Sequence, residues 1–355
     1  MKYALIGCGR ISPNHLAAAK ENNLEIAAIC DIRKSNMEDK RIKFDLPSSA
    51  REYTDYREML DREQPQLVAI ATESGKHAQI ALDCMEAGCN VIIEKPIALS
   101  LADADRIIAK GREKQVKVCA CHQNRFNKSI QKIREALEKG RFGKLFYGTA
   151  HIRWNRSYEY YARAKWRGTW EQDGGALMNQ CIHNIDLLRW MMGDEIEEVY
   201  GVTRQRFHDY LEAEDVGMAV VQFKNGAVAT IEGTTNVYPK NLEETLYLFG
   251  EEGTVKLGGK STNNIDIWEF ADERETDAAN QRLQEEAANV YGNGHARLFA
   301  DMAGAMREDR KPYVDARAGR RALELVLAIY KSQKEKIPVK LPLRNFACEE
   351  MREEF

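Results

Sequence analysis

The sequence lacks the features that mark a secreted, membrane-spanning or zinc-binding protein. Its eight cysteines include no C-x-x-C pair, so it predicts neither a disulfide framework nor a zinc site. No apolar run approaches the roughly 18 residues that a membrane span needs, and Arg10 interrupts the N-terminal apolar segment too early for a signal peptide. We therefore expect a cytoplasmic protein with no bound metal and no membrane partner.

An excess of charge of either sign is also absent. The 52 Lys and Arg residues nearly balance the 55 Asp and Glu residues, which leaves a net charge of −3. That balance argues against nucleic acid as a partner, because nucleic-acid-binding proteins present a basic surface. With 355 residues, 44% of them hydrophobic and 30% charged, the chain is too apolar for a disordered protein and long enough for two domains.

The first third of the chain alternates short apolar runs with helical segments. We expect strands at 3–6, 24–30, 67–71, 90–93 and 116–121, and helices at 11–20, 76–87 and 100–114. Continuously apolar strands between helices are typical of a parallel sheet that is covered on both faces. This pattern predicts an α/β fold, a doubly wound Rossmann domain over residues 1–122.

Strand patterns dominate after residue 122. We expect strands at 144–154, 216–223, 227–236, 242–249, 254–257 and 265–270, and helices at 130–139, 175–192, 281–289, 295–307 and 315–331. Asn225-Gly226 between two alternating runs predicts a hairpin. The pattern predicts an α+β domain over residues 123–355, with an open, mostly antiparallel sheet flanked by helices. We expect this domain to bind substrate and to form the contacts between subunits.

A glycine-rich turn, G-x-G-x-x-S, follows the first expected strand. Gly7 permits the tight turn, Gly9 lets the backbone approach a pyrophosphate, and Ser12 stands where a third glycine is usual. The helix that follows offers free N–H groups and a positive dipole end to phosphates. Asp31, at the end of the second expected strand, would accept hydrogen bonds from ribose hydroxyls and repel a 2′-phosphate. The pattern predicts NAD in preference to NADP, although Arg33 nearby favours the phosphate.

Two further segments carry side chains that suit proton and hydride chemistry. Glu94-Lys95-Pro96 follows the strand expected at 90–93, at the edge where ligands bind to such sheets. Asn179 and His183 are four residues apart on one expected helix, so they share a face. The Gly174-Gly175 pair before them suits a helix that enters a cleft.

With these three motifs in this order, the sequence resembles the Gfo/Idh/MocA oxidoreductase family, of the glucose-fructose oxidoreductase and inositol dehydrogenase type, over essentially its whole length. The matching segments are G-C-G-R-I-S-P-N-H at 7–15, A-T-E-S-G-K-H at 71–77, E-K-P at 94–96 and the Gly-Gly…Asn…His…Asp run at 174–186. The resemblance implies NAD(P)-dependent oxidation of a hydroxyl on a sugar, cyclitol or similar polyol, without a metal. It also implies that Lys95 and His183 are the catalytic residues.

The cofactor-binding set implied by the resemblance is Gly7, Gly9, Arg10, Ile11, Asp31, Thr72, Ser74, His77, Glu94 and Lys95. The sequence departs from the family at three positions. Ser12 replaces the third glycine, Ser74 stands where many members have Pro, and Asn179 stands where many have Asp. An Asp at that last position can join a proton relay, whereas an Asn can only orient its neighbours. His183 is therefore expected to act alone as the acid/base.

A narrower resemblance is to the branch that oxidises UDP-N-acetylglucosaminuronic acid at C3 for bacterial surface polysaccharide. It rests on residues 160–161, 166–170, 177–180 and 237–242. Cations that suit carboxylate and phosphate groups gather in and near these segments: Arg153, Arg156, Arg163, Lys165, Arg167 and Lys240. The expected substrate-binding set is Lys95, Arg156, Tyr161, Trp166, Arg167, Asn179, His183 and Tyr238. This resemblance further implies a 2-oxo acid co-substrate that regenerates NAD in place.

Three alternatives stay open at this point: an inositol or other sugar dehydrogenase of the same family, an NAD-dependent glycosidase that works by redox and elimination, and a regulator that only binds dinucleotide. Retention of Lys95 and His183 argues against the regulator. In the expected mechanism, His183 accepts the hydroxyl proton while Lys95 stabilises the oxygen, and the two roles can be exchanged. Apolar stripes on 216–223 and 227–231 predict a homodimer or homotetramer.

Overall fold

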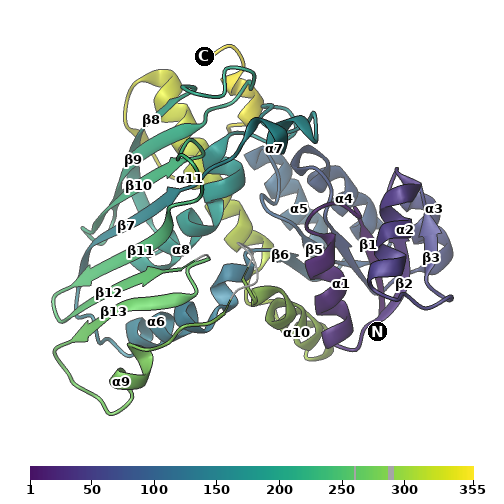
Figure 1. The fold of residues 1–355 in the computed structure, drawn as a ribbon, viewed down its shortest axis with the longest axis horizontal. Coiled ribbons are helices and arrows are strands. Elements are labelled where there is room, and N and C mark those ends of the chain that lie inside the picture. Colours follow the sequence, from purple (N-terminus) through teal and green to yellow (C-terminus); the bar gives the residue numbers. More distant parts are fainter. Residues whose placement is uncertain (260, 287–291) are drawn as a thin grey trace. The chain divides into compact units, whose positions relative to one another are not determined.

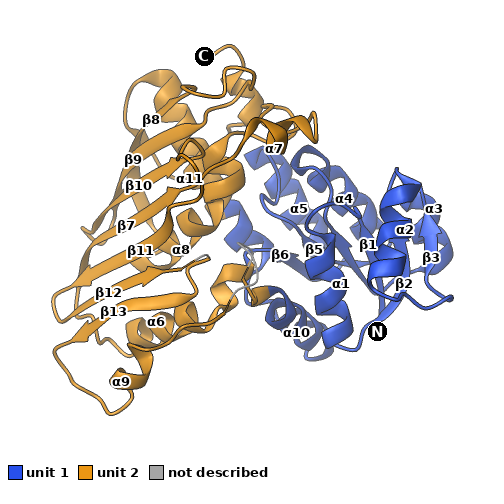
Figure 2. Ribbon diagram, in the orientation of Figure 1, with its two compact units in different colours: residues 1–122, 295–320 blue, residues 123–294, 321–355 orange. Residues whose placement is uncertain are grey.

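The computed structural model describes residues 1–259, 261–286 and 292–355. These residues form two compact units (Figure 2): unit 1 comprises residues 1–122 and 295–320, and unit 2 comprises residues 123–294 and 321–355. The expected division assigned every residue after 122 to the second domain, whereas residues 295–320 group with unit 1. Packing explains the difference, because the Phe299 ring lies 5.7 Å from both the Tyr3 and the His15 ring.

Unit 1 contains a six-stranded parallel sheet in the order β3-β2-β1-β4-β5-β6 (Figure 1). The strands are β1 (Lys2–Ile6), β2 (Glu25–Cys30), β3 (Arg51–Tyr53), β4 (Leu67–Ile70), β5 (Asn90–Ile93) and β6 (Val118–Ala120). The helices are α1 (Ser12–Glu21), α2 (Lys34–Lys43), α3 (Tyr56–Glu63), the 3-10 turn η1 (Ser74–Lys76), α4 (His77–Glu86), α5 (Leu101–Glu113) and α10 (Gly294–Arg307). The predicted doubly wound parallel sheet is confirmed.

The apolar runs form strands of this sheet because both of its faces are buried. All four residues of β4 are buried, and a parallel sheet requires such runs because helices cover it on both sides. Three short elements, α2, β3 and α3, escaped the sequence analysis. The helix α2 buries only Met37, and β3 has three residues of which two are exposed, so neither carries an apolar pattern.

The carboxyl ends of the parallel strands position the expected cofactor residues. Gly7 follows β1, Asp31 follows β2, Thr72 lies two residues after β4, and Glu94 follows β5. Since carboxyl ends of parallel strands lie at one edge of a sheet, these residues share that edge.

Unit 2 contains an eight-stranded sheet in the order β13-β12-β11-β7-β10-β9-β8-β14. The strands are β7 (Leu145–Arg153), β8 (Ile196–Arg204), β9 (Val216–Phe223), β10 (Val228–Thr234), β11 (Glu243–Gly250), β12 (Gly253–Gly258), β13 (Asn264–Phe270) and β14 (Val339–Lys340). The pair β10 and β7 is parallel, and the other neighbouring pairs are antiparallel. The predicted open, mostly antiparallel sheet and the hairpin at Asn225-Gly226 are confirmed.

Helices pack on one face of this sheet. They are η2 (Gln123–Phe126), α6 (Lys128–Glu138), α7 (Tyr158–Ala162), the π-helical turn η3 (Leu177–Cys181), α8 (Ile182–Met192), α9 (Asp277–Asn280), η4 (Cys348–Met351) and α11 (Ala316–Glu335), whose first residues belong to unit 1. Glycine permits the close approach of α8. A Cβ atom on Gly148 of β7 would lie 2.7 Å from the sulfur of Met192.

Three sequence expectations about unit 2 need correction. The helix expected at 175–192 begins with the π-helical turn η3 rather than as a continuous α-helix. The helix expected at 281–289 does not form in its described part, where Gln284 instead bridges to Asn264; residues 287–289 lie outside the described residues. The strand β8 was not expected, because Glu197-Glu198 and Gly201 obscure its alternation.

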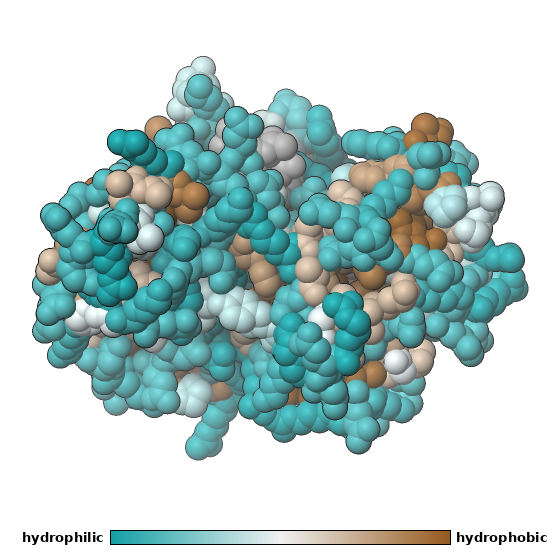
Figure 3. Space-filling view, turned by 90° about the horizontal axis from the view of Figure 1, so that it is seen from below, coloured by the Kyte–Doolittle hydropathy of each residue, from teal (hydrophilic) through white to brown (hydrophobic). Residues whose placement is uncertain are grey.

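The opposite face of the sheet in unit 2 carries exposed apolar side chains. They include Tyr200, Val202, Met218, Val220 and Val228, which are 37–54% exposed. Hydrophilic side chains predominate on the face of the molecule shown in Figure 3, where hydrophobic residues form separate patches. Among the described residues, no helix is both long and apolar enough to cross a bilayer.

Candidate functional site

The glycine-rich turn of unit 1 has the geometry that a phosphate-binding turn requires. Gly7 has φ +95°, and a Cβ atom there would lie 2.4 Å from the carbonyl oxygen of Ala71, so only glycine fits. A Cβ atom on Gly9 would meet nothing within 4 Å, which leaves space beside the start of α1. The buried Ser12 hydroxyl donates to the carbonyl of Gly9 at 2.7 Å. Arg10 is exposed, and Ile11 is half-buried at the start of α1.

Asp31 is held at the end of β2 by backbone groups. Its carboxylate accepts hydrogen bonds from the N–H groups of Cys8 and Arg33, each at 2.8 Å, and from the Asn36 amide at 3.1 Å. The Cys8 bond ties this carboxylate to the glycine-rich turn. Arg33 contributes a backbone N–H, while its side chain is exposed. An acid fixed in this way can accept ribose hydroxyls.

The turn after β4 is joined to the turn after β5 through His77. Its Nδ1 lies 2.8 Å from the carbonyl oxygen of Pro96, and its Nε2 lies 3.2 Å from that of Thr72. The ring is buried, and burial lowers its pKa, so the neutral ring donates to one carbonyl at a time. His77 therefore spans two backbone turns. Ser74 is also buried in this turn, and Thr72 is half-buried.

Glu94 lies in a buried cluster with His15, Cys121 and His295. Its Oε1 is 2.7 Å from Nε2 of His15 and 3.7 Å from Nε2 of His295, and its Oε2 accepts the N–H of Lys95 at 3.2 Å. Burial raises the pKa of Glu94, but the hydrogen bond with His15 and the electrostatic interactions with both histidines outweigh burial and lower that pKa well below its usual value. The carboxylate thus anchors the backbone of Lys95, whose bond to Pro96 is cis.

The same four side chains form the donor set that a metal ion would need. Their ligand atoms all lie within 4.8 Å of one another. Two ligands of one tetrahedral zinc ion stand about 3.3 Å apart, because each is about 2.0–2.1 Å from the metal. The 2.7 Å separation of His15 and Glu94 is instead a hydrogen-bond distance. As they stand, His15 and Glu94 form a hydrogen-bonded pair.

In unit 2, the buried His183 lies in the first turn of α8, and Asn179 lies in the π-helical turn before it. The Asn179 amide donates to the carboxylate of the buried Asp173. The other oxygen of Asp173 accepts the N–H of Gly168 at 2.8 Å. Asn179 is therefore oriented by an acid that the sequence analysis did not single out.

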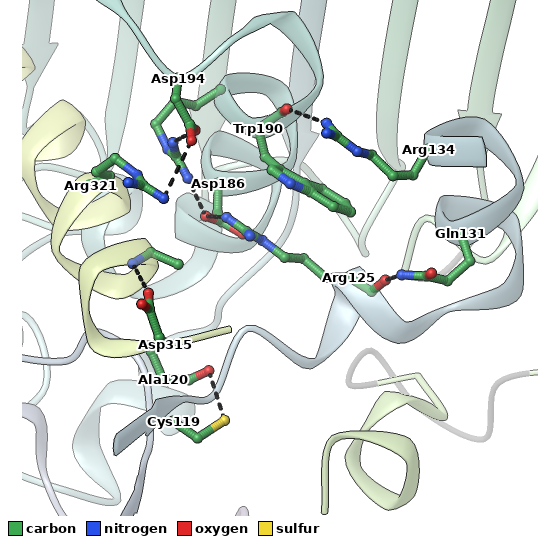
Figure 4. A network of polar contacts seen from close by, with 12 residues as sticks. Cys119, Ala120, Arg125, Gln131, Arg134, Asp186, Trp190, Asp194, Asp315 and Arg321 are labelled. Atoms are coloured by element: carbon green, nitrogen blue, oxygen red, sulfur yellow. Dashed lines mark hydrogen bonds and ion pairs between the residues drawn. The ribbon is translucent and has the colours of Figure 1, made fainter. Parts of the chain in front are cut away.

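A buried ion-pair network anchors α8 within unit 2 (Figure 4). Arg125 of η2 binds Asp186 through two hydrogen bonds of 2.6 and 2.7 Å. Arg189 also contacts Asp186 at 3.3 Å, and Arg321 of α11 reaches Asp194 at 3.3 Å. Bidentate pairs of this kind fix geometry. Asp186 belongs to the motif at 174–186, and only the structure reveals that Arg125 anchors it.

Two arginines of unit 2 lie beside the ring of Tyr160, and among the described residues neither has a carboxylate partner. The guanidinium carbons of Arg156 and Arg167 lie 5.2 and 4.2 Å from the centre of the Tyr160 ring. Arg156 donates to the carbonyl of Asn155 and to the amide oxygen of Asn241, and Arg167 donates to the carbonyl of Tyr160. Within residues 1–259, 261–286 and 292–355, no carboxylate pairs with either guanidinium, and both Nε atoms are buried without a hydrogen-bond partner.

The other residues expected near the substrate differ in burial and in hydrogen-bond or ion-pair partners. Tyr161 is buried, and its hydroxyl donates to Thr235 at 3.3 Å. Trp166 is half-buried and Tyr238 is 91% exposed. Arg153 is paired with Glu232 at 2.6 Å and with Glu243 at 2.5 Å, on the sheet face opposite α8, so its charge is already compensated.

Glu244 of β11 lies near Arg156 but does not neutralise it at neutral pH. Burial raises the pKa of Glu244 to about 8, although the charge of Arg156 acts to lower it. A carboxyl group with this pKa is mostly protonated at pH 7. Arg156 therefore keeps an uncompensated charge.

Family comparisons agree with this geometry. Residues 1–122 match the NAD-binding Rossmann domain of an oxidoreductase family, and residues 134–341 match its C-terminal alpha/beta domain. The chain belongs to the Gfo/Idh/MocA oxidoreductase family. Together with the geometry of the glycine-rich turn, this membership makes NAD the cofactor and the protein an NAD-dependent dehydrogenase.

Several family members are similar over nearly their whole length. The WlbA dehydrogenase from Bordetella pertussis, in complex with NADH and UDP-GlcNAcA, is 35% identical with a TM-score of 0.88, over 97% of this chain and 98% of that one. The WlbA dehydrogenase from Chromobacterium violaceum, with the same ligands, is 33% identical with a TM-score of 0.88, over 97% and 96%. Myo-inositol 2-dehydrogenase from Thermotoga maritima is 26% identical over 96% and 98%. The chain is thus a sugar or cyclitol dehydrogenase.

Proposed function

We propose that this enzyme oxidises the C3 hydroxyl of UDP-N-acetylglucosaminuronic acid with NAD. The observation that carries the proposal is the pair Arg156 and Arg167, two half-buried cations with no carboxylate partner among the described residues. An unpaired charge that is partly removed from water is unfavourable, so the pair calls for an anion. The bound ligands of the two WlbA neighbours support the same substrate.

The substrate offers the anions that these cations need. UDP-N-acetylglucosaminuronic acid carries a carboxylate and a diphosphate, and guanidinium groups bind both kinds of group bidentately. Asn241 belongs to the segment 237–242 and accepts from Arg156 at 3.1 Å, so this segment orients that arginine. A neutral cyclitol would leave both charges uncompensated.

The proposed mechanism divides the chemistry between Lys95 and His183. Bound NAD supplies the acceptor for the C3 hydride. His183 takes the proton of the C3 hydroxyl as general base, which contributes roughly 10²- to 10⁴-fold. Lys95 donates a hydrogen bond to the same oxygen and stabilises its developing negative charge. The roles of the two residues can be exchanged.

Residues at the carboxyl edge of the parallel sheet in unit 1 would hold the cofactor. The open space beside Gly9 and the N-terminus of α1 suit the pyrophosphate, and Asp31 suits the adenine ribose. Arg10, Ile11, Thr72, Ser74 and Glu94 complete the proposed cofactor set, and we assign His77 the task of joining the turns at Thr72 and Pro96.

The second candidate is an inositol dehydrogenase, which the relative from Thermotoga maritima favours. An assay for NADH formation with UDP-sugars, inositols and free hexoses separates the two. It is run with and without a 2-oxo acid, because NAD regenerated in place would hide NADH. We expect oxidation of UDP-N-acetylglucosaminuronic acid, with a product lighter by two hydrogen masses. Oxidation of inositol with this compound untouched in both conditions would reject the proposal.

We also propose that the enzyme is a homodimer or homotetramer. The exposed apolar residues on the sheet face opposite α8 support this assembly, since monomeric proteins rarely leave such a patch in water. Light scattering at micromolar concentration should give a mass of two or four chains. A single-chain mass would reject the assembly without affecting the substrate proposal.

A further inference from the structure

Glu214 is a buried carboxyl group that the proposed mechanism does not use. It lies in the segment before β9 and is 1% exposed. Its Oε1 accepts the N–H of Leu177 at 2.8 Å and the hydroxyl of Tyr330 at 2.9 Å. Its backbone carbonyl accepts the N–H of Ala176 at 2.9 Å. One residue thus receives two consecutive N–H groups from the first turn of the helix that leads to His183.

The start of that helix packs closely against the Glu214 side chain. A Cβ atom on Gly175 would lie 1.6 Å from Oε2 of Glu214, so the side chain occupies the space that any other residue at 175 would fill. The N-cap residue of η3, Ala176, supplies no side-chain cap. Free N–H groups at a helix start need acceptors, and an unmet buried donor is costly. Glu214 supplies the acceptor from outside the helix.

We propose that Glu214 is a positioning residue for the reaction: its carboxyl group caps the helix that carries Asn179 and His183 and thereby fixes where these side chains stand. The inference rests on the proposed function in one respect, that His183 is the acid/base. The turn it caps is π-helical, and π-helical turns recur at functional sites. A loosened first turn would displace Asn179 and His183 together.

The environment of Glu214 keeps it uncharged at neutral pH. Burial raises its pKa to about 8, although the hydrogen bonds from Leu177 and Tyr330 act to lower it. The titratable groups that face it are Tyr330 of α11, Cys348 of η4 and the adjacent Asp215. A protonated carboxyl group still offers a carbonyl oxygen as acceptor. Glutamine offers the same acceptor, so it should replace Glu214 well.

Three variants test the inference: Glu214→Ala, Glu214→Gln and the control Glu324→Ala. Glu324 is also a buried glutamate of unit 2 that accepts a backbone N–H, but that N–H belongs to Leu343 after β14, at 2.8 Å, rather than to residues 175–185. Two readouts are needed. One is amide hydrogen exchange in residues 175–185, which requires no substrate. The other is kcat and KM on the sugar that the wild type oxidises, with NAD affinity measured by titration.

We expect Glu214→Ala to increase exchange in residues 175–185 and to lower kcat at least tenfold, with NAD affinity within twofold of the wild type. Glu214→Gln should stay within threefold in kcat and keep the wild-type exchange. Glu324→Ala should change neither the hydrogen exchange of residues 175–185 nor kcat. If Glu214→Ala does not fold, Glu214→Asp, whose carboxyl group is one methylene short, replaces it with the same expectations.

Wild-type exchange and kcat in folded Glu214→Ala would overturn the inference. Equal loss in Glu214→Gln and Glu214→Ala would also overturn it, because the charge rather than the cap would then matter. If the wild type oxidises none of the sugars, the proposed function fails, while the exchange measurement still decides whether Glu214 caps the helix.

Discussion

The two units treat their polar site residues differently. In unit 1, Asp31, His77 and Glu94 of the proposed cofactor set each bind groups of the same unit, so these side chains are held in place by the protein itself. In unit 2, the hydrogen bonds of the Arg156 and Arg167 side chains to other described residues go to neutral oxygens. Side chains held in this way are preorganised for the NAD that a Rossmann domain of this family binds. Two guanidinium groups without a carboxylate partner among the described residues favour an anionic ligand.

The largest effect is expected from replacing Lys95 of unit 1 or His183 of unit 2, the two proposed catalytic residues. Lys95→Met and His183→Ala should each lower kcat by at least about 100-fold, because the proposed mechanism has both side chains act on the transition state. NAD affinity should stay within about tenfold in a direct titration. A His183→Ala enzyme with near-normal turnover would make His183 a structural residue of α8.

A matched glycine pair tests the preorganisation of unit 1. Gly9→Ala should fold as the wild type does, since its Cβ meets nothing within 4 Å, but should weaken NAD binding at least tenfold by filling the space beside the phosphates. Gly7→Ala should instead destabilise the protein itself, because its Cβ would lie 2.4 Å from a carbonyl oxygen. Thermal melts without NAD and NAD titrations distinguish the two. Unchanged NAD affinity in Gly9→Ala would place the pyrophosphate elsewhere.

Removing one arginine tests the uncompensated charge of unit 2. Arg156→Ala and Arg167→Ala should each raise KM for UDP-N-acetylglucosaminuronic acid roughly 10- to 100-fold, because a hydrogen bond to a charged group contributes about 1.5–3 kcal/mol. NAD affinity should not change. Arg163→Ala is the matched control, since Arg163 lies in the same segment but is exposed. An equal effect at Arg163 would indicate general electrostatic attraction rather than a defined contact.

A smaller effect is expected at Asp31. Asp31→Asn removes the charge while keeping one acceptor for the N–H of Cys8, so the glycine-rich turn should persist. The preference for NAD over NADP should narrow about tenfold, because repulsion of the 2′-phosphate is relieved. Binding titrations with both dinucleotides measure it. Tighter binding of NADP by the unchanged enzyme would mean that Arg33 decides the preference.

The last prediction concerns the dependence of stability on pH. The pKa of Glu214 is raised from 4.5 to about 8, so its contribution to stability is fully present below about pH 4.5 and is lost as pH rises through 8. The melting temperature of the wild type should therefore fall more between pH 5 and pH 9 than that of Glu214→Gln. If the melting temperatures of the wild type and Glu214→Gln change equally with pH over this range, the carboxyl group is ionised throughout and the prediction is wrong.

Local signals in the sequence account for most of unit 1 and for part of the site. The turn at Gly7 and Gly9, the acid at Asp31 and the continuous apolar strands are all encoded within a few residues. The partners of these groups are not. His295 reaches Glu94, Glu214 reaches Leu177 and Asn241 reaches Arg156 across long stretches of chain. No periodicity or spacing reveals such pairs.

The sequence also does not show which of the expected cations are paired with carboxylates. All six cations near the expected substrate segments carry the same formal charge, yet Arg153 is neutralised by Glu232 and Glu243 whereas Arg156 is not neutralised by Glu244. The difference lies in which face of the sheet each glutamate occupies and how far burial raises its pKa. Neither property can be obtained from composition. The structure therefore argues against Arg153 as part of the expected anion site.

The most direct test of the account is a competition in one tube. UDP-N-acetylglucosaminuronic acid, its neutral-ring counterpart UDP-N-acetylglucosamine and myo-inositol are mixed at equal concentration with enzyme, NAD and a 2-oxo acid, and products are followed by mass spectrometry. The account predicts loss of two hydrogen masses from the uronate, with the other two compounds unchanged, and loss of this selectivity in Arg156→Ala. Oxidation of myo-inositol, or equal oxidation of the two UDP-sugars, would contradict it.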